Sequence, residues 1–157
     1  MSEKMDYVIF ASAWSSYGIE SLRDGLEPAI VRVISDGATP VIFKGTPAPR
    51  TDLSRCTLHR ALGWTNIDCS FSAGEALAEQ QPYDEFIDEI AQNYRGVVVV
   101  DPKSLLCSGG YCRTELAGMA VYRDRYHLND VAARELGKVF LGREANFLTV
   151  LNAPIPP

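Results

Sequence analysis

Long apolar runs, basic residues and histidine are all scarce in this sequence. No stretch of about 18 consecutive apolar residues occurs, so no segment is expected to span a bilayer. The opening MSEKMDYVIFASAW lacks the basic start, apolar stretch and small-residue cleavage site of a signal peptide. We therefore expect that the sequence as given contains no targeting signal. Lys and Arg number 15 against 20 Asp and Glu, with a net charge of -5. This acidic balance argues against partners that need a basic face, namely nucleic acids and anionic membrane surfaces.

The four cysteines are even in number and fall into two close pairs. Cys107 and Cys112 flank Gly109-Gly110, which suits a tight reversal, and Cys56 and Cys69 bracket a short helix and turn. We expect two local disulfides and an oxidising compartment; four buried reduced thiols are the alternative. Neither pair has the CxxC spacing of a redox motif. With two histidines in the chain, we expect no Cys/His zinc site.

Three short apolar segments predict β-strands, at Tyr7–Ser12, Pro40–Lys44 and Val97–Asp101. The third is apolar without alternation, which is typical of a central parallel strand covered on both faces. Helices are predicted between and after them. Their ranges are Ile19–Ser35, where Gly25 and Pro28 predict a kink or two pieces, Leu53–Leu62, Tyr83–Asn93 and Leu128–Leu141.

This alternation of strands and helices predicts an open α/β sheet. Such sheets place their functional sites at the carboxyl ends of the strands. The ends available here are Ser12-Ala-Trp14, Gly45-Thr-Pro47 and Asp101-Pro102.

The stretch YRDRYHLND contains an acid and a base three residues apart. Asp124 can reach the Nδ1 hydrogen of His127 within one turn of loop, which leaves Nε2 free to face a nucleophile. Asn129 or Asp130 can cap the helix that follows and anchor this loop. A chance spacing, or a histidine that helps to cap the helix, is the alternative. The pair predicts half of a catalytic triad.

Around this pair, the stretch from VVVVDPKSLLCSGGYC to YRDRYHLNDVAARELGKVFL resembles the end of an SGNH-type esterase/acyltransferase domain. More narrowly, it is similar to the extracytoplasmic SGNH domain fused to membrane acyltransferase-3 proteins, which O-acetylate bacterial surface polysaccharides and lipopolysaccharide. DYVIFASAWSSYG and ATPVIFKGTPAP resemble upstream segments of that family. The resemblance implies one SGNH-like domain over residues 1–157, with a core at about 6–142 and an irregular tail at 143–157.

The resemblance assigns roles to individual residues. Asp124 and His127 match the triad acid and base, and Cys107 and Cys112 match a disulfide near that site. Trp14 matches a tryptophan at the first turn, where it would line a sugar-binding surface or pack at the edge of the core. Ser12, beside it, is a candidate substrate contact.

The family's nucleophile is a serine in a G-D-S motif, and this chain contains no GDS. The resemblance implies a flavodoxin-like, three-layer α/β/α domain with a mainly parallel sheet. Because the family's G-D-S motif follows the first strand, we expect that this strand is lacking here. Candidates for a local nucleophile in its place are Ser12, Ser15 and Ser16, whose other expected role is helix capping.

The resemblance implies acetyl transfer to or from a bacterial cell-surface glycan by a Ser-His-Asp mechanism, with no metal or organic cofactor. The acyl donor would be a membrane acyltransferase domain, the acceptor a glycan, and the location periplasmic or at the extracytoplasmic face of the inner membrane. The alternative is a catalytically inactive domain that binds a glycan or a partner. Without its first strand, Tyr7–Ser12 should be a sheet edge, and a homodimer is a further expectation.

Overall fold

The computed structural model describes residues 5–64, 66 and 68–142. They fall into two compact units, which are described separately. Unit 1 comprises the described parts of Met1–Gly45 and Ala78–Pro102. Unit 2 comprises those of Thr46–Leu77 and Lys103–Pro157.

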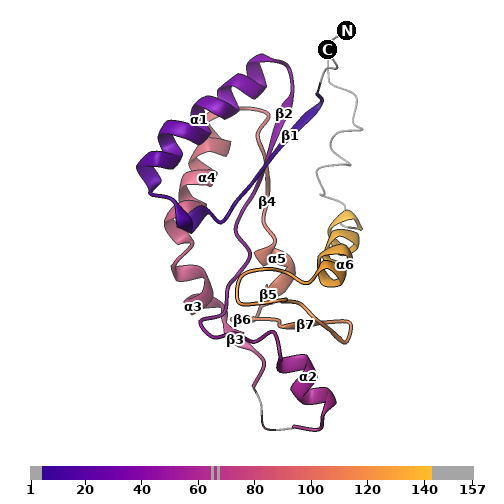
Figure 1. Ribbon diagram of the computed structural model, residues 1–157. Coiled ribbons are helices and arrows are strands. Elements are labelled where there is room, and N and C mark those ends of the chain that lie inside the picture. The colour runs from indigo at the N-terminus through magenta and orange to yellow at the C-terminus, as the bar shows by residue number, and fades with distance from the viewer. Residues whose placement is uncertain (1–4, 65, 67, 143–157) are drawn as a thin grey trace. The chain divides into compact units, whose positions relative to one another are not determined.

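Unit 1 is built on a parallel three-stranded sheet (Figure 1). Its strands are β1 (Tyr7–Ala11), β2 (Thr39–Phe43) and β4 (Val98–Val100), in the order β1-β2-β4. All three predicted strands are confirmed, each ending one residue before the predicted limit. Parallel neighbours require crossover connections, and helices supply them here. The chain is thus an α/β protein with a parallel sheet, as its sequence predicts.

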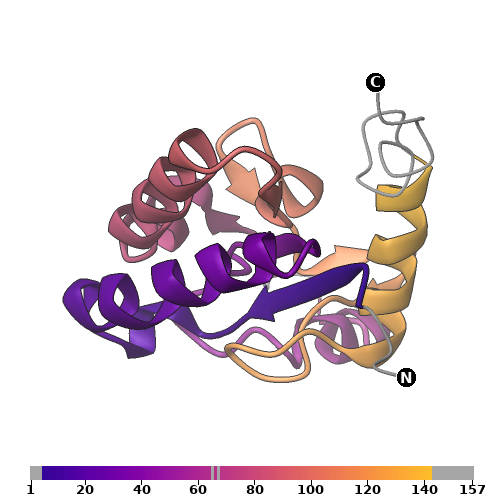
Figure 2. The same ribbon diagram turned by 90° about the horizontal axis from the view of Figure 1, so that it is seen from above.

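Two long helices, α1 (Ile19–Ser35) and α4 (Gln81–Asn93), cover one face of this sheet (Figures 1 and 2). Phe10, Ile42 and Val99 lie side by side across the strands and face the helices. Ile30 of α1 and Ile87 of α4 pack in the same core and are almost fully buried. Burying each such side chain stabilises the fold by roughly 1.5–3 kcal/mol.

Two details of unit 1 differ from the sequence-based prediction. The apolar strand β4 is not central: among the described strands it pairs with β2 alone, and β2 is the middle strand. An uninterrupted apolar run reports burial, and burial does not require a neighbour on both edges. Of the kink or two pieces predicted for Ile19–Ser35, the two pieces are wrong, because α1 runs through Gly25 and Pro28 as one helix that ends before Gly37, which has φ +78°. The kink stays a prediction.

The β1 strand lies at an edge of the sheet, as expected, and pairs with β2 alone among the described strands. Its residues alternate in exposure, and Ile9 is 60% exposed on the face away from the helices. An open edge beside exposed apolar side chains is a place where another strand can add. The homodimer stays a prediction.

Unit 2 contains short elements: two β-sheets of two-residue strands, with helices around them (Figure 1). One sheet is antiparallel and has the order β3 (Phe71–Ser72), β6 (Tyr111–Cys112), β5 (Cys107–Ser108). The other pairs β7 (Glu115–Leu116) with β8 (Met119–Ala120). The helices are α2 (Cys56–Ala61), α3 (Ala73–Ala78), α5 (Lys103–Leu106) and α6 (Asp130–Leu141).

The predicted elements of unit 2 are partly confirmed. Helix α6 forms with Asn129 as its cap, whose side chain accepts a hydrogen bond from the Val131 N–H at 2.9 Å. Helix α2 starts three residues later than predicted, at Cys56, and α3 and α5 were not predicted. The predicted tail, 143–157, lies outside the described residues. Within the described part of the chain, no helix combines the length and the apolar character that a bilayer crossing requires.

Candidate active site

Backbone hydrogen bonds close the loop that carries Asp124 and His127. The N–H of Arg123 donates to the carbonyl of His127, and the N–H of Asn129 donates to that of Val121, each at 2.8 Å. Tyr122 and Leu128 form an isolated antiparallel bridge at the base of the loop. The loop is therefore a closed turn whose end leads directly into α6.

Tyr122 anchors this loop inside unit 2. Its side chain is 1% exposed, and its hydroxyl donates to the carbonyl oxygen of Pro47 at 2.7 Å. Burial raises the pKa of this phenol, so the hydroxyl keeps its proton and remains a donor. Arg125 repeats the arrangement from the other side of Asp124, because its Nε donates to the carbonyl of Pro49 at 3.0 Å. Two contacts to one distant proline segment thus hold the residues on either side of the acid.

The Asp124 carboxylate is held by the loop's own backbone. Its Oδ1 accepts hydrogen bonds from the N–H groups of Tyr126 and His127, both at 2.9 Å. Side-chain oxygens of aspartate commonly cap turns in this way. These two donors, followed by the imidazole of His127, hold the pKa of Asp124 well below its usual range. The group is therefore a carboxylate over the whole physiological pH range.

The imidazole of His127 meets this carboxylate as the sequence predicts. Nδ1 lies 2.9 Å from both Oδ1 and Oδ2 of Asp124. A carboxylate can only accept, so Nδ1 carries the hydrogen and Nε2 has the lone pair. No residue that the structure describes is hydrogen-bonded to Nε2, and the His127 side chain is 64% exposed. The nitrogen that a general base needs is thus open to solvent.

Cationic and aromatic groups border the pair and were not singled out from the sequence. Nε of Arg123 lies 3.6 Å from Oδ2 of Asp124, and the Arg125 guanidinium lies 4.9 Å from the centroid of the Tyr126 ring. Tyr126 is 58% exposed. The signal available in the sequence was the Arg and Tyr residues on both sides of Asp124 in YRDRYH. These side chains give the surroundings of His127 two positive charges and an accessible ring.

The acid limb of the stability curve should report on the Asp124 turn. Because folding lowers this pKa from the ordinary 3.8, the carboxylate stabilises the native state above about pH 4. That contribution should fade as the pH falls below 4 toward the depressed native value. Urea unfolding of wild type and Asp124→Asn between pH 2 and 7 checks it: the difference between the two proteins should shrink as the pH falls. A difference that is constant down to pH 2 would contradict the assignment.

Both predicted disulfides are present, and every cysteine of the chain is in one of them. Cys107 and Cys112 are a registered pair across the β5–β6 hairpin, with Cα atoms 4.0 Å apart. Cys56 at the start of α2 bonds Cys69, with Cα atoms 5.6 Å apart. The alternative of four reduced thiols is therefore wrong. Two disulfides fit an extracytoplasmic domain, since such bonds persist in oxidising compartments.

The site residues predicted at the first strand end lie in unit 1. Trp14 is 7% exposed in the core, and its Nε1–H donates to the carbonyl of Phe43 at 2.7 Å. This is the packing role expected for it; its sugar-binding role stays a prediction. Ser12 is exposed, and both residues line a shallow, mostly apolar hollow of about 380 Å³ beside β1 and α1. Ser15 and Ser16 lie in the short 3-10 helix η1 (Trp14–Ser16) and cap neither it nor α1.

Comparison with known families gives one match that bears on this site. The model for the family described as "SGNH domain (fused to AT3 domains)" matches residues 1–142. No curated protein and no solved structure gives a significant match to the chain. The match covers both units and includes the Asp124–His127 loop.

Proposed function

Because the chain belongs to the family of SGNH domains that are fused to AT3 domains, we propose that it is an O-acyltransferase or esterase domain acting on a bacterial cell-surface glycan. In this proposal Asp124 and His127 are the acid and base of a Ser-His-Asp mechanism. The membrane acyltransferase domain supplies the acyl group. The location is the periplasm or the extracytoplasmic face of the inner membrane, which the two disulfides support.

One observation carries this proposal: Nδ1 of His127 is fixed by an ionised carboxylate while Nε2 is exposed and has no partner among the described residues. A histidine held in this tautomer can accept a proton at Nε2 from a hydroxyl, and Asp124 stabilises the imidazolium that results. Backbone donors that keep Asp124 ionised remove any competition for the proton. The pair therefore has the orientation and charge of a general base.

The proposed reaction has two steps, acylation of the serine and transfer of the acyl group to the acceptor. A serine hydroxyl gives its proton to Nε2 of His127, and the serine oxygen attacks the acyl carbon. An acyl-serine forms, and the donor's alkoxide leaves with the proton from Nε2. A sugar hydroxyl then attacks the acyl-serine in the same manner and leaves as the acylated sugar. Water in place of the sugar makes the reaction an ester hydrolysis.

The nucleophile is part of the proposal. Since the chain has no GDS motif, we assign the serine to a segment outside this sequence, on a further strand that adds to the open edge of β1. The complete domain would then have the flavodoxin-like, three-layer arrangement. The open edge and the exposed Ile9 support the addition of a strand there.

The test uses the full product of the gene, so that any segment encoded beside this chain is included. Release of p-nitrophenol from p-nitrophenyl acetate, and transfer of acetyl to an oligosaccharide detected by mass, are both expected. The chain of 157 residues alone is the matched control and should be inactive. Activity of this chain alone would overturn the assignment of the nucleophile. If the full product transfers acetyl neither to water nor to the oligosaccharide, a glycan-binding or partner-binding domain is favoured instead.

A further inference from the structure

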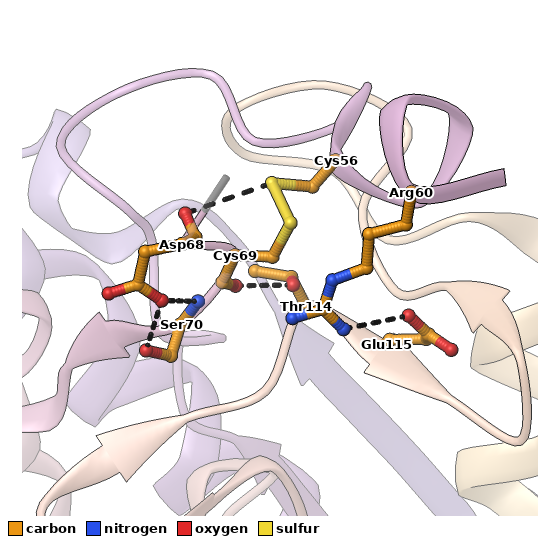
Figure 3. A network of polar contacts seen from close by, with 7 residues as sticks. All are labelled: Cys56, Arg60, Asp68, Cys69, Ser70, Thr114 and Glu115. Carbon is orange, nitrogen blue, oxygen red and sulfur yellow. Dashed lines mark hydrogen bonds and ion pairs between the residues drawn. A yellow bond between two sulfur atoms is a disulfide. The ribbon is translucent and has the colours of Figure 1, made fainter. Parts of the chain in front are cut away.

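A second hollow, of about 270 Å³, lies wholly within unit 2 and has no part in the mechanism above. Cys69 and Cys112 contribute to its lining. Buried Thr114 is also in the lining, and the polar side chains that are exposed or half-buried come from α2, the β5–β6 hairpin and the segments next to them: Arg60, Ser70, Ser108, Tyr111, Arg113 and Glu115. We name it the disulfide hollow. Figure 3 shows the part that includes Arg60, Ser70 and Glu115.

The floor of the disulfide hollow is held by covalent bonds and buried polar contacts. The Cys56–Cys69 bond ties the segment before Ser70 to α2, and the Cys107–Cys112 bond closes the hairpin that carries Tyr111 (Figure 3 shows the first). The hydroxyl of Thr114, a 5% exposed residue, donates to the carbonyl of Cys69 and joins the two segments. Sites held in this way bind with little loss of conformational entropy.

The side chains above this floor remain accessible. Tyr111 is 60% exposed and stands opposite Ser108 and Ser72 in the two strand pairings of β6. Arg113 is exposed and makes no ion pair with any residue in the described ranges. An exposed aromatic ring flanked by hydroxyls and a guanidinium presents the groups that bind the face, the hydroxyls and the carboxylate of an acidic sugar.

The ion pair in the disulfide hollow is weak enough to be exchanged. Nη1 of Arg60 lies 3.4 Å from Oε2 of Glu115, and the two side chains are 53% and 33% exposed. Exposed pairs of this kind contribute little to stability, so Arg60 can turn to another anion at small cost. Two arginines against one glutamate leave the lining with a net charge of +1, in a chain whose net charge is -5. Glu115 is then a competitor for any anionic ligand.

We propose that the disulfide hollow binds a sugar unit that carries a carboxylate. Tyr111 stacks on the sugar ring, Arg113 pairs with the carboxylate, and Arg60 leaves Glu115 to provide a second contact. That this sugar belongs to the acyl acceptor rests on the proposed function; the binding itself does not. Together with the proposed function, this site makes the acceptor an acidic glycan.

The test is a titration of the folded 157-residue chain with a trigalacturonate, followed by ¹H–¹⁵N NMR and calorimetry. Saturable shifts are expected at Ser70 and at residues 108–115. Arg113→Ala and Tyr111→Ala should each weaken binding by roughly fivefold or more, whereas Arg134→Ala and Tyr7→Ala, which alter exposed residues that line neither hollow, should not. NMR spectra of each variant show whether it is folded.

Glu115→Gln gives the sharpest prediction, because it should tighten trigalacturonate binding by about twofold or more through loss of a competing charge. A neutral trisaccharide should bind more weakly than trigalacturonate and be insensitive to Arg113→Ala and Glu115→Gln. The titration contains no acyl donor and measures binding alone, so its result is independent of the proposed catalysis. Equal binding of inorganic phosphate, equal binding of the neutral sugar, or weaker binding by Glu115→Gln would each overturn the proposal.

Discussion

Replacing His127 with alanine should lower the acyl-transfer or esterase kcat/KM of the full gene product by about 10²–10⁴-fold, the usual contribution of a general base. The reason is geometric: Nε2 has no hydrogen-bond partner among the residues that the structure describes, and Asp124 occupies the other ring nitrogen, Nδ1, at 2.9 Å. Alanine removes the proton acceptor without disturbing Tyr122, which anchors the loop through Pro47. The measurement is p-nitrophenyl acetate hydrolysis under pseudo-first-order conditions.

The chain provides its own control for this experiment. His59, the second histidine, lies on α2 and stacks on Trp64 with ring centroids 4.6 Å apart. His59→Ala removes an imidazole of the same kind from a place with no assigned chemistry, and its kcat/KM should stay within about twofold of wild type. Loss of activity in His59→Ala with none in His127→Ala would place the base elsewhere.

Removing the Cys56–Cys69 disulfide should destabilise the protein by about 3 kcal/mol, and removing Cys107–Cys112 by about 2 kcal/mol. The order follows from the lengths of the loops that the bonds close, 13 and 5 residues of sequence separation. A longer closed loop restricts the unfolded chain more. Urea unfolding of Cys56→Ala/Cys69→Ala and Cys107→Ala/Cys112→Ala gives both numbers.

Unit 2 has particular need of these bonds. Its strands are two residues long, and its buried cluster of Leu106, Val121, Tyr122 and Leu136 is small. Such a cluster provides little hydrophobic stabilisation. Complete reduction of the wild type should destabilise it at least as much as the larger double substitution. Unchanged stability on reduction would show that the bonds are not needed to hold unit 2 together.

The sequence predicts those parts of the fold in which apolar periodicity is long. The helices α1, α4 and α6 each carry three or more apolar side chains at helical spacing, and they form where predicted. A strand of two residues, such as β3, is too short to show a period, and β3 was missed. The order of strands was also out of reach, because the apolar run at Val97–Val100 looks the same in a central strand and at an edge.

The candidate site divides in the same way. The contact between Asp124 and His127 follows from a spacing of three residues, and each partner in a disulfide lies close to the other in sequence. What the sequence could not show is the support for the acid. The bond from Tyr122 to Pro47 joins residues 75 apart, and no local pattern encodes such a contact.

The most direct test of the central claim is the tautomer of His127, read from ¹⁵N chemical shifts and long-range ¹H–¹⁵N couplings in a chain labelled at histidine. At a pH where the imidazole is neutral, we expect hydrogen on Nδ1 and a lone pair on Nε2, because the Asp124 carboxylate can only accept. Asp124→Ala should return the ring to a mixture dominated by the Nε2–H form, and His59 serves as the internal reference. Hydrogen on Nε2 in the wild type would contradict the role of His127 as a general base, since the exposed nitrogen could then take no proton from a hydroxyl.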